Sequence, residues 1–273
     1  MPTARFSVSQ LPPAVRTAVE EHTGPLLHAE EVAEGFNSEI AVRLTSVSGT
    51  WHVKGLRTDH PRVWTQAREA AIAPFLTGLA PALRWHVVSH GWDLLGFEAL
   101  TGHHHADYAP GSPDLPKVVA LLNRLGETAR PDIPLRHAEQ RLKAYVQDPA
   151  DTAFFSGDHL LHTDLNTANV LVAEEARLVD WGWATRGAAW LDAAYWVIWL
   201  IASGHTPASA ESWAAQTFAW ATAPAPGVTA FASASHRLWT EISTNDPEPW
   251  TVRLETAATV WHEYRARACP RVA

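Results

Sequence analysis

The chain has 273 residues, 47% of them hydrophobic and 18% charged, which is the composition of a folded globular protein rather than a disordered or fibrous one. Its 29 acidic and 21 basic residues give a formal net charge of -8, which argues against nucleic acid as the main partner because phosphate backbones require basic surfaces. Cys269 is the only cysteine, and this excludes an intrachain disulfide and a cluster of thiolate metal ligands.

Neither an export signal nor a membrane span is expected. The N-terminal residues lack the apolar core of a signal peptide. The most apolar segment, residues 188–204, contains Asp192 and has too few uninterrupted apolar residues to cross about 30 Å of hydrocarbon. We therefore expect a cytoplasmic protein that does not associate with a membrane.

The first third of the chain combines two helical patterns with two strand pairs. Residues 12–24 predict a short helix, and residues 61–79 predict a second one from apolar residues at helical spacing. Alternating apolar residues predict an antiparallel hairpin over 38–56 and another strand pair over 83–100. Lys54 is one of only three lysines in the chain, and it lies inside the first hairpin.

The rest of the chain is predicted to be mainly helical. A loop rich in Gly, Pro and His, residues 101–114, marks the expected boundary between an N-terminal lobe, 1–100, and a C-terminal lobe, 101–273. Beyond it, the patterns predict helices at 115–127 and 136–147, a hairpin at 159–181, and helices beginning near Trp190, Ser209, Ala230 and Pro249. This order predicts an α+β fold, with a β-rich N-lobe and a mainly helical C-lobe, and not a parallel sheet.

Polar residues interrupt the apolar segments of the predicted 159–181 hairpin. The stretch HTDLNTANVLV contains Asp164 and Asn169, and LVDWGWA places Asp180 at the end of the following strand. The oxygens of Asn169 and Asp180 suit a hard cation such as Mg²⁺, which leaves Asp164 to accept a proton from a substrate hydroxyl. Phosphoryl transfer also requires a lysine on an N-terminal strand and a helix glutamate that orients it, and Lys54 and Glu69 have these positions.

These motifs resemble those of the aminoglycoside phosphotransferase and choline kinase families, which are relatives of the protein kinases. The resemblance extends from the first predicted hairpin to the helix after Asp192 and implies a two-lobed protein-kinase-like fold that binds ATP and Mg²⁺. It implies these roles: catalytic base, Asp164; Mg²⁺ ligands, Asn169 and Asp180; phosphate-binding lysine and its partner, Lys54 and Glu69.

Further residues receive supporting roles. Backbone groups from Glu98 to Leu100 are expected to bind adenine, and Asn37 and Ser38 are expected to contact phosphate. His162 and Asp192 are expected to support the catalytic loop from beneath it. The chain departs from the family pattern at Thr163, because the family commonly has glycine between the histidine and the aspartate; a Cβ restricts the backbone there.

The predicted reaction is transfer of phosphate from Mg-ATP to the hydroxyl of a small molecule, with an aminoglycoside or a related amino sugar as the first candidate. Choline, homoserine or another metabolite is the alternative acceptor. Acidic residues of the last third are a candidate pocket for an amine: Glu241, Asp246, Glu248, Glu255 and Glu263. Two other classes stay open, a non-catalytic nucleotide-binding regulator and a metal hydrolase built on His103, His104, His105 and His162.

Overall fold

The computed structural model describes residues 5–32 and 38–268, and these form two compact units. The first comprises the described part of Met1–His104 together with Arg177–Trp183, and the second comprises His105–Ala176 with the described part of Ala184–Ala273. The first is built on a β-sheet and the second is mainly helical, so the predicted α+β class is confirmed.

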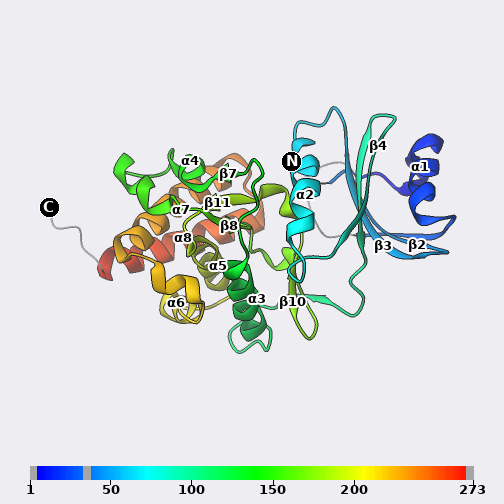
Figure 1. The fold of residues 1–273 in the computed structure, drawn as a ribbon. Helices are drawn as coiled ribbons and strands as arrows, with labels where there is room; N and C mark the ends of the chain where they lie inside the picture. The colour runs from blue at the N-terminus through cyan, green and yellow to red at the C-terminus, as the bar shows by residue number, and fades with distance from the viewer. Residues whose placement is uncertain (1–4, 33–37, 269–273) are drawn as a thin grey trace. The chain divides into compact units, whose positions relative to one another are not determined.

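The first unit contains a five-stranded antiparallel sheet with the strand order β1-β2-β3-β5-β4 (Figure 1). Its strands are β1 (Leu26–Glu31), β2 (Ile40–Ser46), β3 (Gly49–Arg57), β4 (Leu83–Ser89) and β5 (Trp92–Glu98). Its helices are α1 (Pro13–Thr23) and α2 (Trp64–Ile72), with 3-10 turns η1 (Val8–Gln10), η2 (Ala73–Phe75) and η5 (Trp181–Trp183). The pairings of β2 with β3 and of β4 with β5 confirm the two predicted strand pairs.

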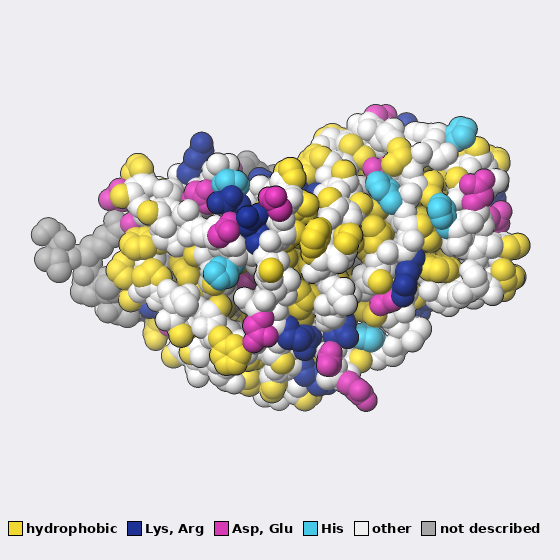
Figure 2. Space-filling view, viewed as in Figure 1, with side chains coloured by type: hydrophobic (Ala, Val, Ile, Leu, Met, Phe, Trp, Pro, Cys, Tyr) yellow, Lys and Arg dark blue, Asp and Glu magenta, His cyan; other side chains and the backbone are white. Residues whose placement is uncertain are grey.

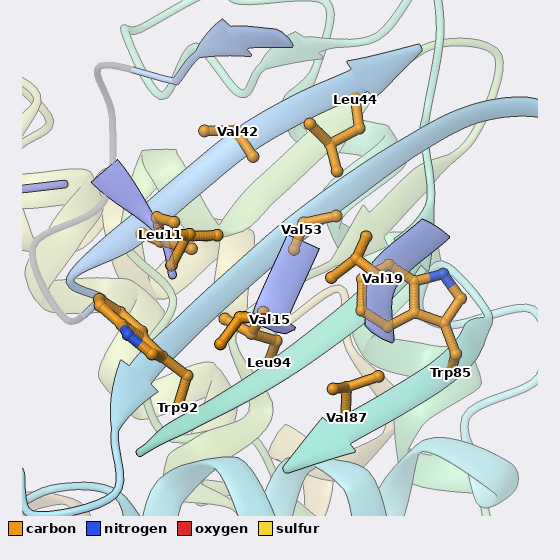
Figure 3. Close-up of a cluster of buried hydrophobic side chains, with 11 residues drawn as sticks. Leu11, Val15, Val19, Val42, Leu44, Val53, Trp85, Val87, Trp92 and Leu94 are labelled. Carbon is orange, nitrogen blue, oxygen red and sulfur yellow. The ribbon is translucent and has the colours of Figure 1, made fainter. Parts of the chain in front are cut away.

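The core of the first unit lies between α1 and one face of this sheet. Figure 3 shows the residues that gather there from the α1 segment and from strands β2 to β5: Leu11, Val15, Val19, Val42, Leu44, Val53, Trp85, Val87, Trp92 and Leu94. Neighbouring residues of a strand point to opposite faces, so Lys54 lies on the face opposite to Val53. In register, Lys54 lies between Ala41 of β2 and Leu95 of β5.

The second unit is a set of helices joined by short strands. The helices are α3 (Leu115–Glu127), α4 (Ala138–Leu142), α5 (Leu191–Ala202), α6 (Pro207–Ala214), α7 (Ala225–Asn245) and α8 (Pro249–Ala268). Helix α7 packs along α8, and α5 packs against both α6 and α8 (Figure 1). The core of this helix group includes Phe231, whose ring makes edge contacts with Phe155, Trp190 and Trp261.

The short strands and turns of this unit are β7 (Arg136–His137), η3 (Pro149–Phe155), β8 (His159–Leu161), η4 (Thr167–Asn169), β9 (Val170–Val172), β11 (Thr185–Gly187) and η6 (Phe218–Thr222). Two further short strands, β6 (His104–His105) and β10 (Ala176–Leu178), have residues in both units. The predicted hairpin over 159–181 is confirmed only in its second half, where β9 pairs with β10. Its first strand, β8, pairs instead with β11 beyond that range, and β11 also pairs with β7. The predicted helix at 136–147 is limited to α4, since Arg136 and His137 pair with β11 instead.

Within the described residues, no helix combines the length and the apolar character that a membrane span requires. On the face drawn in Figure 2, Lys and Arg side chains lie next to Asp and Glu side chains, among hydrophobic and neutral groups. This face therefore presents no basic field of the kind that a phosphate backbone would require.

Candidate active site

The first unit contains a buried ion cluster of Lys54, Glu69 and Asp180. The Lys54 Nζ lies 2.6 Å from Glu69 Oε2 and 2.9 Å from Asp180 Oδ1. These residues come from β3, α2 and the segment just before η5, so the structure brings together three of the predicted site residues.

Packing between α2 and η5 holds Asp180 in place. The backbone N–H of Leu178 donates to the carbonyl of Leu79, and that of Trp181 donates to Glu69 Oε1. Asp180 itself has a positive φ of 64°, a conformation that aspartate tolerates better than most residues. The chain therefore turns sharply at Asp180, between two backbone hydrogen bonds.

Ionisation in this cluster is coupled, because one ammonium lies within ion-pair distance of two carboxylates. Burial alone would lower the pKa of Lys54, but Asp180 and Glu69 outweigh it and raise that pKa. Burial raises the pKa of Glu69, and Lys54 opposes this effect. The Asp180 side chain is 24% exposed and that of Glu69 is 5% exposed, so Asp180 is the more accessible oxygen ligand.

His52 lies on the same face of β3 as Lys54, two residues before it. In register it lies between Arg43 of β2 and Phe97 of β5. Burial lowers the pKa of this half-buried imidazole to about 4, and the positive charge of Lys54 acts in the same direction. His52 is therefore neutral at physiological pH, on the face that carries the ion cluster.

In the second unit, Asp192 of α5 holds the backbone before Asp164. Its Oδ2 accepts the backbone N–H of His162 at 2.8 Å, and its Oδ1 accepts that of Thr163 at 2.7 Å. Burial raises the pKa of Asp192, and the hydrogen bonds from His162 and Thr163 oppose this. Below the loop, the buried imidazole of His162 accepts the backbone N–H of Asp164 through Nδ1 at 3.3 Å.

A second set of hydrogen bonds holds Asp164 and Asn169. The Asn166 side chain donates to Asp164 Oδ1 at 2.8 Å, and its own Oδ1 accepts the backbone N–H of Asn169 at 3.0 Å. The Nδ2 of Asn169 donates to the carbonyl of Asp164 at 3.1 Å. Since that nitrogen is used as a donor, the atom that Asn169 offers to a cation is its amide oxygen.

The remaining predicted site residues are placed as follows. Asn37 lies outside the described residues, and Ser38 is half-buried two residues before the start of β2. The Glu98 carboxylate pairs with Arg84 at 2.6 Å, and its backbone N–H donates to Ala82. Leu100 is half-buried after β5. These positions leave the predicted adenine and phosphate contacts as predictions.

The alternative sites suggested by histidines and by acidic residues receive little support. Across residues 5–32 and 38–268, no group of three or more His, Cys, Asp or Glu side chains is arranged to hold a metal ion. A cavity of about 360 Å³ on α7 is lined by His236, Arg237, Thr240, Glu241, Thr244 and Asn245. Glu241 is the only one of the five acidic candidates that lines it, beside two groups that are basic or can become so.

The sequence analysis did not predict three residues that lie next to predicted site residues: His52, Arg141 and Asn166. His52 follows from strand alternation, because it lies two residues from Lys54. Asn166 lies inside the quoted motif, three residues before Asn169. Arg141 has no local signal, since its partners Thr163 and Thr185 lie 22 and 44 residues further along the chain.

No protein-family model matches the chain, and no curated protein matches its sequence. Solved structures do share its fold. Choline kinase LicA from Streptococcus pneumoniae gives a TM-score of 0.60 at 12% identity, over 92% of this chain and 99% of that chain. A thermostable mutant of aminoglycoside phosphotransferase APH(4)-Ia, in complex with ADP and hygromycin B, gives 0.63 at 13% identity, over 95% and 100%.

Spectinomycin phosphotransferase APH(9)-Ia, in complex with ADP and spectinomycin, gives a TM-score of 0.57 at 11% identity, over 92% of this chain and 93% of that chain. The resemblance to the aminoglycoside phosphotransferase and choline kinase families is thus confirmed at the level of the fold, which is kinase-like. Fold alone does not determine function, so the activity must be argued from the residues of the site.

Proposed function

We propose that this chain is a small-molecule kinase that transfers the γ-phosphoryl group of Mg-ATP to a hydroxyl group of its acceptor. The observation that carries the proposal is the buried cluster of Lys54, Glu69 and Asp180 in a chain with a kinase-like fold. Burying charged groups is costly, and a buried cluster of ionisable groups with shifted pKa values is typical of a functional site.

The first unit has the groups that would bind the nucleotide. Lys54 would contact the phosphates, with its ammonium oriented by Glu69. Asp180 would fit a Mg²⁺ ion because its carboxylate is the more accessible of the two in the cluster. Asn169 of the second unit offers an amide oxygen to the same kind of ion. When bound, Mg²⁺ would neutralise charge on the phosphate oxygens.

Asp164 is the proposed catalytic base. Its carboxylate is oriented by the Asn166 side chain, and its backbone N–H is held by His162. A base fixed in this way can accept the proton of the acceptor hydroxyl without first losing conformational freedom. Catalysis would then rest on positioning and charge neutralisation, as the phosphoryl-transfer template expects.

The acceptor is proposed from the chemistry of the structural relatives. Solved structures with this fold include a choline kinase and phosphotransferases bound to hygromycin B or spectinomycin. An aminoglycoside or related amino sugar is the first acceptor to test, followed by choline, homoserine and other metabolites.

The test is ADP release from Mg-ATP with a panel of these acceptors, with Asp164→Asn as the matched variant. Acceptor-dependent ADP release that falls by at least about 100-fold in Asp164→Asn is expected, because general-base catalysis contributes roughly 10²–10⁴-fold. If ATP raises the melting temperature but no acceptor stimulates release, the chain is better described as a nucleotide-binding module. If ATP has no effect on melting, the kinase proposal is wrong.

A further inference from the structure

Thr163 has a backbone conformation that is unfavourable for its side chain. Its φ is 67°, in the left-handed region, and it precedes Asp164 directly. A β-branched residue is rarely found there, since its Cβ substituents crowd the backbone, whereas glycine enters this region at little cost. Such a residue keeps this conformation only when its surroundings hold it.

Two sets of contacts surround this residue. On the backbone side, the N–H of Thr163 donates to Asp192 Oδ1, as described above. On the side-chain side, Arg141 Nη1 donates to Thr163 Oγ1 at 2.6 Å. The same nitrogen donates to Thr185 Oγ1 at 2.7 Å, and a guanidinium Nη carries two hydrogens, so both bonds form together.

The anchors of this arrangement belong to regular structure. Arg141 lies in α4, and Thr185 begins β11, where it is fully buried and lies opposite Leu161 of β8. Strand β8 ends immediately before His162. The guanidinium therefore connects the loop that carries Asp164 to the strand paired with the start of that loop.

We propose that Arg141 is a positioning residue for the candidate base. Its paired hydrogen bonds to Thr163 and Thr185 hold Thr163 in the left-handed conformation, and this sets the direction in which the Asp164 carboxylate points. The guanidinium thus stabilises, by contacts from outside the loop, a backbone conformation that glycine at position 163 would adopt without them. The catalytic part of this inference rests on the proposed function; the conformational part does not.

A double-mutant cycle tests the proposal. Arg141→Met removes the donors and keeps the length of the side chain, and Thr163→Gly removes both the strain and the acceptor. The matched control is Lys143→Met, which removes a positive charge from an exposed residue two positions further along. Each variant is measured for kcat and for the KM for ATP, with intrinsic ATP hydrolysis as the assay if no acceptor is known, and for its urea unfolding midpoint.

We expect kcat to depend on Arg141 when residue 163 is threonine, and to depend on it much less when residue 163 is glycine. Arg141→Met should lower kcat by ~10-fold, the equivalent of about one charge-assisted hydrogen bond, with the KM for ATP nearly unchanged. In the Thr163→Gly background the same substitution should cost less than about 3-fold, a coupling of the size expected for contacting residues. Lys143→Met should have no effect in either background.

Two results would overturn the proposal. One is an equal loss of kcat on Arg141→Met in both backgrounds, which would make Arg141 a structural residue independent of Thr163. The other is an equal loss of the urea unfolding midpoint on Arg141→Met in both backgrounds, which would overturn the conformational claim. A midpoint loss that disappears in the Thr163→Gly background supports that claim. The midpoints decide alone if the wild type shows no turnover, because the proposed function then fails.

Discussion

At the scale of single residues, Lys54 is the ammonium that pairs with both Glu69 and Asp180. Lys54→Met removes this ammonium from the two ion pairs. We expect the unfolding free energy at pH 7 to fall by about 3 kcal/mol, the usual cost of breaking a buried ion pair. Urea denaturation of the variant and the wild type measures this difference.

The loss should depend on pH in a defined direction. Burial raises the pKa of Glu69 and Lys54 opposes this, so without Lys54 the folded-state pKa of Glu69 rises further above the unfolded value. The stability of the variant is then retained at low pH and lost as the pH rises through the folded pKa. The deficit should therefore be smaller at pH 5 than at pH 7. Adding Glu69→Gln should recover part of the loss at pH 7. An equal deficit at both pH values would contradict this account of the cluster.

His52 predicts a second pH dependence, in the opposite direction. Its pKa is about 4 in the folded chain against an ordinary value of 6.5. Between these values the unfolded chain binds one more proton, so stability is complete above the unfolded pKa and falls as the pH drops towards 4, by up to about 3 kcal/mol. His52→Gln should flatten this part of the curve of unfolding free energy against pH, and the same change at the exposed His159 should not.

The residues proposed to carry the chemistry are easier to recognise in the sequence than the residue proposed to position them. Lys54, Asp164 and Asp180 are recognisable because each is a polar residue in or beside an apolar strand pattern. Arg141 lies on a short helix with no unusual neighbours in sequence. Its role depends on a contact made only after β8 and β11 pair, and no local pattern encodes that contact.

At the scale of elements, burial decided which predictions succeeded. Strand β1 was missed because all but its first residue are exposed, so it lacks the alternation that marks a half-buried strand. Helix α2 ends earlier than predicted, at Ile72, and the chain continues into the 3-10 turn η2, because Pro74 has no N–H to donate to the carbonyl four residues before it. Only the second half of the 159–181 hairpin formed, as β9 and β10, because β8 pairs with β11 instead.

The contact between α2 and η5 depends on Gly182. A Cβ at this position would lie 2.8 Å from the Cβ of Thr65, which is closer than real Cβ atoms approach one another. Gly182→Ala should therefore separate α2 from η5, lower the unfolding free energy by about 1–3 kcal/mol, and weaken ATP binding through Glu69 and Asp180. Urea denaturation and isothermal titration with ATP measure the two effects.

The control for this substitution is Gly126→Ala. Gly126 lies in α3 with nothing near the place that a Cβ would occupy, so alanine there should stabilise the helix by about 0.5–1 kcal/mol. If Gly182→Ala behaved like Gly126→Ala, the close packing of η5 on α2 would not be what holds Asp180.

At the scale of the whole molecule, the first compact unit is not one continuous segment. Its sheet is complete within residues 26–98, yet Arg177–Trp183 returns to it after 72 residues that belong to the second unit. The predicted lobe boundary near residue 100 assumes that the chain passes once from the first lobe to the second. It does not account for the return of Arg177–Trp183 to the first unit. The returning residues supply Asp180 to Lys54, a backbone donor to Glu69, and the buried ring of Trp181.

A fragment of residues 1–104 should therefore be much less stable than a fragment in which residues 177–183 follow it through a flexible linker. Without the returning segment, Lys54 and Glu69 keep each other but lose Asp180, and the surface that Trp181 covers is opened. Burial of that indole alone stabilises by about 3 kcal/mol, a large share of the stability of a domain of this size. Heteronuclear NMR spectra and urea unfolding of the two fragments measure the difference.

A linked variant with Asp180→Asn and Trp181→Ala should behave like the short fragment, because it restores the length of the chain without these two contacts. Equal dispersion and equal midpoints for all three fragments would show that the sheet and α1 are sufficient to fold this unit.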